Sequence, residues 1–410
     1  MKKVVILGGG VIGLSTAYFL AQEGHSVTVI DASNMNDGCS YGNAGMVVPS
    51  HVVPLAQPGM ISQGFRWMFN SKSPFYVKPR FSSDLLSWGW QFYKHAKPAH
   101  VERSKSALCA LSLLSKELFR DLARKADFSW KEQGLLMLYR SDRVGEEERA
   151  AGKIAQELGL EVDFLSKFEV MALEPNLRMD VLGAVHYRSD AHLDPRRYMQ
   201  FLKENVLAMG VRVLAETEVI EMRRLGGKVD AIRLQNEELA LDELVICAGA
   251  WSPKLARQLG IKLRILPGKG YSFQLDRKVA MPTIPAILCE GKVAVTPYDQ
   301  TIRFGGTMEI THTGDHRLNP NRIRGIVDTI QQFYPETDVA MPDLSTVWHG
   351  FRPCTPSGLP YIGRSEKFNN VLIASGHAMM GLSLAPATGF LINELICGKK
   401  TSIDLSAFRF

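Results

Sequence analysis

The sequence Lys3-Val-Val-Ile-Leu-Gly-Gly-Gly-Val-Ile-Gly13 joins a short β-branched run to glycines in the pattern G-x-G-x-x-G. Such a run is typical of a strand buried in a parallel sheet. Apolar residues then recur at helical spacing from Leu14 to Ala21, and Gly24 ends this helix. Ser26-Val-Thr-Val-Ile30 reads as a second strand that leads into Asp31. Residues 3–31 therefore predict a complete βαβ unit.

The glycine pattern is informative because each glycine has a physical role in binding a dinucleotide. One permits the tight turn, one lets the backbone approach a pyrophosphate, and one lets the helix pack on the strand. The helix N-terminus then faces the anion. Asp31, eighteen residues after Gly13, is placed to accept hydrogen bonds from a ribose hydroxyl. A glycine-rich turn with nothing bound is the alternative, but the ordered strand, helix, strand and acid favour a dinucleotide site.

This unit alone does not distinguish NAD from FAD. An NAD-binding domain would continue with βα repeats, whereas here the small-residue loop Cys39-Ser-Tyr-Gly-Asn-Ala-Gly45 and a long segment rich in proline and aromatics follow. The buried-strand pattern returns at Leu244-Val-Ile-Cys-Ala-Gly249, which enters a strand-to-helix turn at 250–253, and at Val371-Leu-Ile-Ala-Ser-Gly376. We therefore expect a discontinuous nucleotide-binding domain.

Composition places the chain among ordinary globular proteins. Of its 410 residues 46% are apolar and 22% charged, without a low-complexity tract, which excludes a collagen, a coiled coil and a disordered protein. The formal charge of +6 comes without a run of five like charges, so no nucleic acid partner is expected. Six cysteines without a C-x-x-C pair predict neither a zinc site nor disulfides, and favour the cytoplasm.

Two uncharged stretches resemble membrane segments. Residues 4–21 follow two lysines, as in a signal peptide, but glycines interrupt them and no cleavage site follows. Residues 378–393 are fewer than a membrane span needs and contain Pro386 and two glycines. We expect the first stretch to belong to the βαβ unit and the second to be a buried helix.

Further landmarks follow in order along nearly the whole chain, which resembles the flavoprotein D-amino-acid dehydrogenases of the amino-acid oxidase, glycine oxidase and sarcosine oxidase superfamily. Besides the N-terminal glycines, they are Ser40-Tyr-Gly-Asn-Ala-Gly45, Lys269-Gly-Tyr-Ser272, Arg303-Phe-Gly-Gly306 with Glu309, Gly350-Phe-Arg-Pro353 with Thr355-Pro356, and Ser375-Gly-His377 with Gly381.

The resemblance implies an α/β fold with non-covalent FAD extended across a discontinuous Rossmann-like domain. The isoalloxazine ring would lie at the border of a second, antiparallel-sheet α+β substrate or cap domain. The expected boundaries are residues 1–50, 190–262 and 346–410 for the FAD-binding domain, and 51–189 and 263–345 for the cap domain.

The expected cofactor site combines the βαβ unit with the later landmarks. The small side chains of Asn43, Ala44 and Gly45 would let backbone N–H groups approach the flavin. Val219, in the strand-like segment 215–220, has the position at which relatives contact the adenine. The full expected set is Gly8, Gly9, Gly10, Val11, Ile12, Gly13, Asp31, Ala32, Ser40, Asn43, Ala44, Gly45, Val219, Ala248, Gly249, Trp251, Gly350, Gly376, Met379, Gly381 and Leu382.

Arg352 is the main candidate for binding substrate. A planar guanidinium can hold a carboxylate through two charge-assisted bonds, and Gly350-Phe-Arg-Pro353 matches the family position that binds the substrate carboxylate. A structural arginine in a salt bridge is the alternative. His377 is either a pocket residue or a structural histidine, and Tyr271 and Tyr298 either cap the pocket with a hydroxyl or pack within strands. Cys354 lacks the local pattern expected for covalent flavin attachment.

The resemblance implies oxidative deamination of D-amino acids, with hydride passing from Cα to flavin N5 and electrons going on to a quinone or another acceptor. No residue is assigned as general base, since solvent can take the amine proton. Ser357 and the turn Gly376-His-Ala-Met-Met-Gly-Leu382 depart from the family pattern near the expected pocket. An oxidase or dehydrogenase of glycine, sarcosine or a cyclic amine such as D-proline or D-hydroxyproline therefore competes, and so does a flavin-binding protein without turnover.

Residues 65–93 interleave ten aromatic side chains with lysine and arginine. A helical cap over the active site is expected there, with peripheral contact to the inner membrane as the competing interpretation. Leucines at helical spacing predict a helix over 104–125. Polar residues at 187–195 could suggest a metal cluster, but Asp194 before Pro195 is better explained as a helix cap, and no metal is expected.

Overall fold

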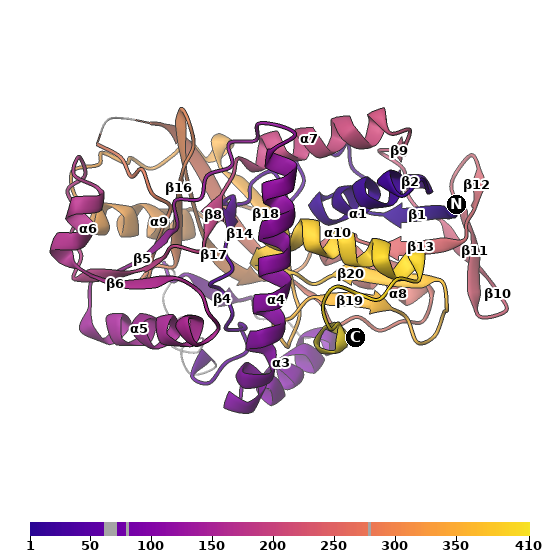
Figure 1. Cartoon of the computed structure of the whole chain (residues 1–410), viewed down its shortest axis with the longest axis horizontal. Coiled ribbons are helices and arrows are strands. Elements are labelled where there is room, and N and C mark those ends of the chain that lie inside the picture. Colours follow the sequence, from indigo (N-terminus) through magenta and orange to yellow (C-terminus); the bar gives the residue numbers. More distant parts are fainter. Residues whose placement is uncertain (61–71, 79–81, 278–279) are drawn as a thin grey trace.

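The computed structural model describes residues 1–60, 72–78, 82–277 and 280–410. A mainly parallel sheet lies at one end of the elongated molecule and a mainly antiparallel sheet at the other (Figure 1). The expected fold class is confirmed. Of the aromatic segment at 65–93, residues 65–71 and 79–81 lie outside the described residues.

The first sheet carries the predicted βαβ unit. Its described strands run in the order β19-β20-β13-β1-β2-β9, and all neighbours are parallel except β19 and β20. The bounds are β1 (Lys3–Leu7), β2 (Ser26–Ile30), β9 (Arg212–Leu214), β13 (Glu243–Ile246), β19 (Tyr361–Arg364) and β20 (Val371–Ser375). Strands β1, β2, β13 and β20 lie close to the four runs that the sequence predicts. The strand-like segment 215–220 forms no strand, because β9 ends at Leu214.

Helices cover one face of this sheet. A small β-meander and a short helix cover the other face. On the first face α1 (Val11–Gln22), α7 (Pro195–Ala208) and α10 (Gly381–Cys397) share an apolar core with the sheet. Gly13 is required there, because a Cβ would lie 1.8 Å from the carbonyl oxygen of Gly8. The other face packs against α8 (Ser252–Gln258) and the meander β10 (Glu221–Leu225), β11 (Lys228–Arg233) and β12 (Glu238–Ala240).

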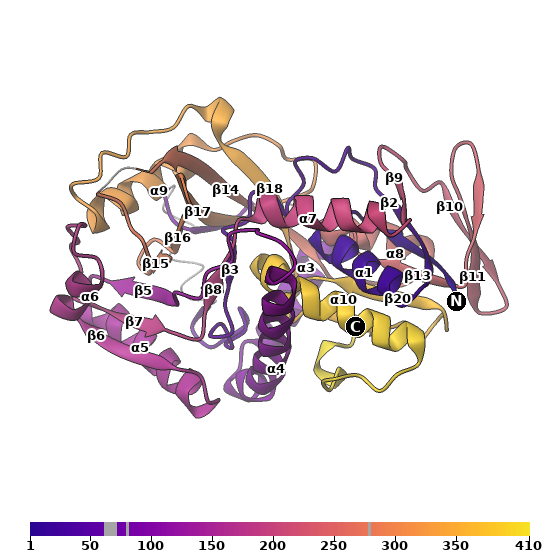
Figure 2. The ribbon, with the colours of Figure 1, turned by 45° about the horizontal axis from the view of Figure 1, so that its top comes forward.

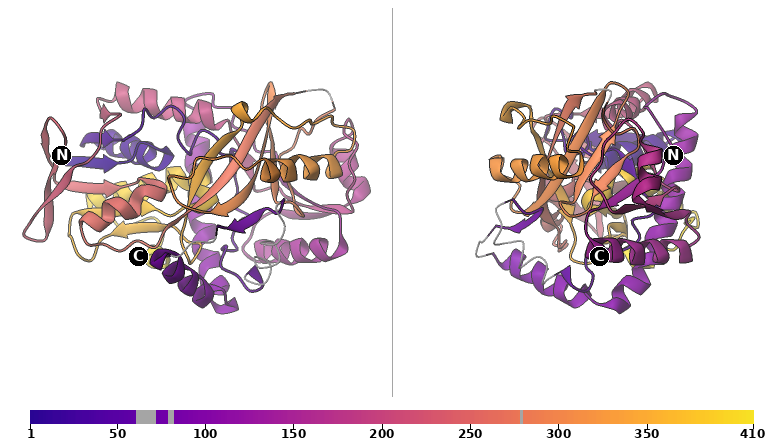
Figure 3. Two further views of the ribbon diagram at one scale, coloured as in Figure 1. Left: turned by 180° about the vertical axis from the view of Figure 1, so that it is seen from behind. Right: turned by 90° about the vertical axis from the view of Figure 1, so that its left-hand side faces the viewer.

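The second sheet lies at the other end of the molecule. Its described order is β18-β14-β17-β16-β15-β5-β7-β6, with β4 paired to β17. The bounds are β4 (Phe75–Val77), β5 (Leu135–Tyr139), β6 (Val162–Ser166), β7 (Gly183–Tyr187), β14 (Leu266–Asp276), β15 (Ala286–Leu288), β16 (Val293–Pro297), β17 (Thr301–Ile310) and β18 (Trp348–Cys354). Helix α9 (Pro320–Phe333) packs on one face, as the view from behind shows (Figure 3). Helices α5 (Asp142–Glu157) and α6 (Lys167–Leu173) lie at the far end.

Two elements lie differently from the expected domain boundaries. Strand β18 belongs to the second sheet, although the boundary at 346 assigned it to the FAD-binding domain. Helix α4 (Pro98–Ala123), which contains most of the predicted helix at 104–125, packs against α10 in the first core (Figure 2). The remaining elements are α3 (Ser83–His95), β3 (Met46–Val47), β8 (Ala191–His192) and short 3-10 turns at Gly249–Trp251, Leu344–Thr346, Ala378–Met380 and Ser406–Phe408.

The two uncharged stretches have the expected structures. Residues 4–21 form most of β1 and α1. Within the described ranges one helical segment, Ala378–Cys397, is long and apolar enough to cross a membrane, and 72% of its most apolar window is buried inside the protein. Asp194 caps α7 as predicted, accepting a hydrogen bond from Arg196 N at 2.8 Å.

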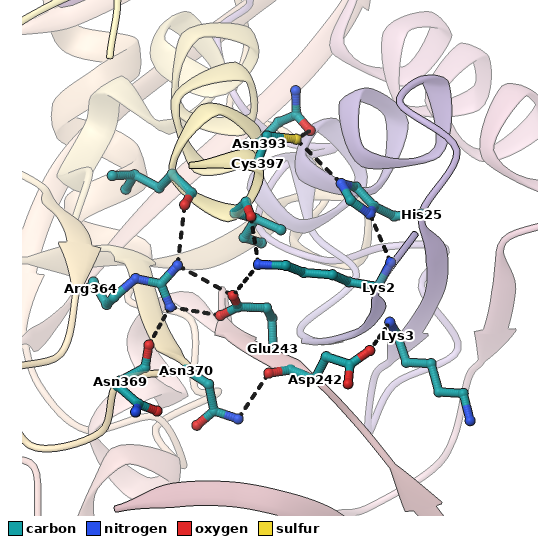
Figure 4. Close-up of polar contacts among 12 residues, drawn as sticks. Lys2, Lys3, His25, Asp242, Glu243, Arg364, Asn369, Asn370, Asn393 and Cys397 are labelled. Carbon is teal, nitrogen blue, oxygen red and sulfur yellow. Dashed lines mark hydrogen bonds and ion pairs between the residues drawn. The ribbon is translucent and has the colours of Figure 1, made fainter. Parts of the chain in front are cut away.

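A buried carboxylate ties the first sheet together at the amino ends of its strands. Glu243 accepts hydrogen bonds from Lys2 Nζ at 2.8 Å and Arg364 Nη1 at 2.7 Å (Figure 4). Lys2 also donates to the carbonyl of Ile396, and Arg364 to that of Leu395, both at the end of α10. One carboxylate therefore connects β1, β13, β19 and α10, and leaves the carboxyl ends of the strands for the site.

Glu243→Gln is expected to lower the free energy of unfolding by about 2 kcal/mol, because the amide loses charge-assisted bonds to two cations. Urea denaturation of the flavin-loaded protein measures this change. Glu366→Gln, at an exposed position on the turn before β20, is the matched control. A midpoint shared by both variants and the parent would show that the Glu243 network contributes no stability.

Candidate functional site

A cavity of about 1700 Å³ runs from the carboxyl ends of β1, β2 and β13 to the face of the second sheet. Small-molecule pockets usually have about 300–1,000 Å³, so this one has room for a dinucleotide and a substrate together. Most of the predicted site residues line it. Of the described candidates, those outside its lining are Gly13, Gly45, Gly376 and Tyr298.

The turn after β1 forms an anion site at one end of the cavity. Gly8 has a φ of +112°, which favours glycine. A Cβ on Gly10 would meet only Ser40 Oγ, at 3.5 Å, so this side of the turn is open to a ligand. Helix α1 begins at Val11 without a side-chain cap or an acidic residue in its first turn. Val11 N donates to Ser40 Oγ at 3.0 Å, but the positive end of the dipole and the N–H groups of Gly10 and Ile12 suit a pyrophosphate, so these residues fit FAD.

Asp31 lies at the end of β2 beside this turn. One carboxylate oxygen accepts from Gly9 N at 2.6 Å, and the other accepts from the N–H and the hydroxyl of Ser33 at 2.7 Å. A carboxylate offers about four acceptor sites, so one remains for a ribose hydroxyl. Thr217 N donates to the carbonyl of Asp31, which brings the segment with Val219 to the same end of the cavity.

The small-residue loop crosses from the first sheet to the second and is held there by its carbonyl groups. Arg303, buried to 2% exposure, donates to the carbonyls of Tyr41 and Asn43. Ser272 Oγ donates to the carbonyl of Gly42 at 3.0 Å, and Tyr298 OH donates to that of Ala44 at 2.9 Å. Tyr298 therefore anchors this loop and does not cap the pocket. Sequence reasoning missed Arg303 and Ser272 as anchors, although both belong to quoted landmarks.

Arg352 lies in the cavity wall on β18. Its Nη1 donates to the carbonyl of Thr307 at 2.5 Å, and burial lowers the pKa of its guanidinium. No ion pair joins Arg352 to a carboxylate in the described part of the chain. The salt-bridge alternative is therefore wrong for these residues. Burying a cation without a full set of hydrogen-bond acceptors costs free energy, unless a bound ligand supplies the missing acceptors.

Gly270 provides the space in which the guanidinium lies. It sits on β14 between β17 and β18, and a Cβ there would lie 1.9 Å from Arg352 Nη1. Strand β17 has a β-bulge opposite Gly270, where two residues, Thr307 and Met308, lie opposite this one glycine. Thr307 has a φ of +62°, strained for a β-branched residue. This bulge places the Thr307 carbonyl where Arg352 can reach it.

The sequence predicts that Arg352 binds a substrate carboxylate, and on that prediction Gly270→Ala is expected to lower kcat/KM about 100-fold, since displacing the guanidinium by about 1 Å would misalign the substrate. Steady-state kinetics with the flavin content measured in parallel would report this loss. Gly363→Ala, on β19 with open space around its Cα, is the control. Unchanged kinetics in Gly270→Ala would mean that Arg352 does not need its present position.

Tyr271 and His377 fit the structural alternatives. Tyr271 belongs to the core under α9, and its hydroxyl donates to Glu309 Oε1 at 2.8 Å. His377 is 3% exposed and bonds Thr388 Oγ1 at 2.9 Å, and burial lowers its pKa to about 3. Both line the cavity, but the Tyr271 hydroxyl is engaged by Glu309, and the low pKa makes His377 a weak base.

Several polar residues of the cavity wall were not anticipated from the sequence. Lys292, Glu148 and His51 come from three separate segments, and no motif signals them. Among the described residues no group of three or more His, Cys, Asp or Glu side chains could hold a metal ion. The cysteines are free thiols. Cys354 is fully buried outside the cavity lining, and burial raises its pKa to about 12.

Comparison with known proteins agrees with this architecture. The model of the family described as "FAD dependent oxidoreductase" (DAO) matches residues 3–395. A protein of Granulibacter bethesdensis named D-amino acid dehydrogenase is 30% identical over 98% of this chain and 97% of its own. Glycine oxidase from Geobacillus kaustophilus superposes with a TM-score of 0.80 at 23% identity, over 100% of this chain and 98% of its own. L-proline dehydrogenase from P. horikoshii gives 0.76 at 21% identity, over 99% and 96%.

Proposed function

Since this chain belongs to the family of FAD dependent oxidoreductases, we propose that it oxidises D-amino acids to 2-oxo acids and ammonia. When bound, FAD supplies the acceptor for the hydride that leaves the substrate Cα. The imino acid produced takes up water and releases ammonia. A curated relative with near-complete coverage of both chains, named D-amino acid dehydrogenase, supports this substrate class.

The observation that carries the proposal is Arg352, a cavity-wall cation that no carboxylate of the described residues pairs. One of its N–H groups donates to the Thr307 carbonyl, and the rest of the planar fork can hold a substrate carboxylate. Fixing the carboxylate orients Cα for hydride transfer, and orientation contributes much of the rate in such a step.

The chain's own residues would hold FAD non-covalently. The N–H groups of Gly10 and Ile12 would bind the pyrophosphate, Asp31 a ribose hydroxyl, and the segment 217–219 the adenine. The loop at 40–45 and the turn at 376–382, which meet where Asn43 Nδ2 donates to the carbonyl of Met379 at 3.4 Å, would contact the ring. Non-covalent binding is supported by Cys354, whose thiol is buried away from the cavity.

Proton removal from the substrate amine is assigned to solvent. His377 is bonded to Thr388, and its pKa of about 3 leaves it a weak base. The hydroxyl of Tyr271 is engaged with Glu309. Water that enters the open part of the cavity can accept this proton, so the reaction needs no dedicated base.

We place the enzyme in the cytoplasm, with electrons passing to a quinone or another carrier and with peripheral contact to the membrane. The support for membrane contact is a helical stripe on α3, where Leu86, Trp90 and Tyr93 are 73%, 58% and 59% exposed. Lys94 and Lys97 lie beside it, and apolar residues flanked by cations suit an anionic lipid surface.

Vesicles of anionic phospholipid are expected to carry the protein upward in a flotation gradient, and the double substitution Trp90→Ser with Tyr93→Ser should remove most of this binding. Leu225→Ser, at a 69% exposed leucine on β10, is the control. Flotation that is absent in the parent, or equal in all three proteins, would exclude α3 as the membrane contact.

Anaerobic bleaching of the flavin band tests the proposed reaction. D-Amino acids should bleach it and their L-enantiomers should not. Bleaching only by glycine, sarcosine or cyclic amines such as D-proline would favour the second candidate, which Ser357 and the unusual turn at 376–382 bring into consideration. A yellow protein that none of these compounds reduces would contradict both. Peroxide formation in air would identify an oxidase.

A further inference from the structure

The cavity ends on the second sheet in a charged pair. Lys292 Nζ lies 3.2 Å from Glu148 Oε1, and both residues line the cavity. Glu148 comes from α5 and its side chain is 11% exposed, whereas 45% of the Lys292 side chain is accessible. Burial disfavours the charged form of Lys292, yet the Glu148 carboxylate keeps its pKa above the usual value. Lys292 is therefore a cation with a reachable head group.

Lys292 lies close to the arginine that would hold the substrate carboxylate. Strands β16 and β17 pair antiparallel with Ala294 opposite Gly305, and the carbonyl oxygen of Lys292, the residue before β16, lies 3.7 Å from the place that a Cβ on Gly306 would take. Thr307, whose carbonyl accepts from Arg352, follows Gly306 on β17, so Lys292 and the anchor of Arg352 lie along the same stretch of this strand.

A row of apolar residues across the second sheet lines the cavity beside Lys292. Gly305 and Ala294 line it from β17 and β16, and Met137 and Ile287 line it from β5 and β15. These residues offer no hydrogen bonds to a ligand side chain. A substrate held by its carboxylate at Arg352 would lay an aliphatic chain here and bring the end of that chain toward Lys292.

The hydrogen-bonding groups at this end favour an acceptor. A lysine ammonium has three N–H donors, and one is used by Glu148. His51 also lines the cavity, with its Nδ1 3.2 Å from Ser50 Oγ, and burial lowers its pKa to about 4, with a smaller effect of Lys292. The histidine is thus neutral, and Lys292 supplies the donors.

Building on the proposed function, we propose that Lys292 is a specificity residue for D-amino acids whose side chain ends in an oxygen acceptor, a carboxamide or a carboxylate. The Lys292–Glu148 pair carries no net charge, so the wall accepts a neutral carboxamide as well as a carboxylate. A terminal ammonium placed against Lys292 Nζ would meet a like charge at close range. A terminal methyl group leaves the lysine donors without a partner.

A series of substrates with five-carbon chains tests this assignment. D-Glutamine and D-glutamate should have kcat/KM at least about tenfold above D-norvaline, and D-ornithine should be poorest. Lys292→Met should abolish the preference through KM with little change in kcat, since the contact is made in ground and transition states alike. D-Alanine, whose side chain does not reach Lys292, should be turned over equally by the parent and Lys292→Met. The control Lys228→Met, on β11 outside the cavity, should keep the parental substrate preference.

Glu148→Gln gives a second, independent test. This substitution leaves the positive charge of Lys292 without its carboxylate partner. The ratio of kcat/KM for D-glutamate to that for D-glutamine should therefore rise about tenfold. Equal efficiencies for D-glutamine and D-norvaline in the parent, or a preference that survives Lys292→Met, would overturn the assignment while the deaminase function stands. Failure of every D-amino acid, D-alanine included, to reduce the flavin would instead reject the function itself.

Discussion

Arg352→Met is expected to lower kcat/KM for D-alanine about 10³-fold or more while the protein keeps its flavin. Truncating one partner of a desolvated charge pair costs about 2–5 kcal/mol, and the lost orientation of Cα adds to this loss. Methionine fills much of the space over Gly270 without offering a donor. Anaerobic stopped-flow reduction of the flavin measures the effect directly, and the flavin absorbance reports cofactor content.

Two comparisons make this result specific. Arg352→Lys should recover only part of the rate, because an ammonium keeps the charge but lacks the planar fork. Arg317→Met, at an 82% exposed side chain on the loop before α9, should behave as the parent. Reduction of the Arg352→Met flavin at the parental rate would show that the substrate carboxylate binds elsewhere.

Gly10→Glu is expected to yield folded protein without flavin. The Cβ itself has space, since Ser40 Oγ at 3.5 Å is its only neighbour within 4 Å. The remainder of the glutamate would occupy the approach to the α1 N-terminus and place a carboxylate where a pyrophosphate should bind. Repulsion and steric exclusion act together, so we expect loss of the cofactor without loss of the fold.

The ratio of visible to ultraviolet absorbance after purification measures flavin content, and circular dichroism checks the fold. Gly89→Glu is the control, because this glycine is exposed on α3 with no atom near its Cα. Stoichiometric FAD in Gly10→Glu would mean that the dinucleotide does not cross the glycine turn. An unfolded variant would be followed by Gly10→Ala, for which a partial loss of flavin affinity is expected.

Local patterns predicted the nucleotide-binding half well. β1, α1 and β2 occupy the residues expected for the βαβ unit, and the N-cap of α7 at Asp194 was read from two adjacent residues. Each of these features depends on near neighbours in the chain. The strand-like pattern at 215–220 was misleading. Strand β9 ends at Leu214, so these residues do not pair in the sheet.

The candidate site was only partly predictable. The arginine motif pointed to Arg352, but not to the bulge at Thr307 or to the space above Gly270 that hold it. Tyr298 was considered a pocket cap, yet its hydroxyl is used by the Ala44 carbonyl, 254 residues away in sequence. A side chain's partner depends on packing between segments that no local pattern describes.

The sequence by itself determined that residues 3–30 form a βαβ unit with a glycine-rich turn, because glycine positions and hydrophobic periodicity are local properties of the backbone. Only the tertiary structure decided which groups meet in the cavity. Lys292 and Glu148 are 144 residues apart, and they become neighbours because β16 and α5 pack at the same end of the second sheet. Contacts of this kind arise from how sheets and helices close on one another, and they set what the cavity can recognise.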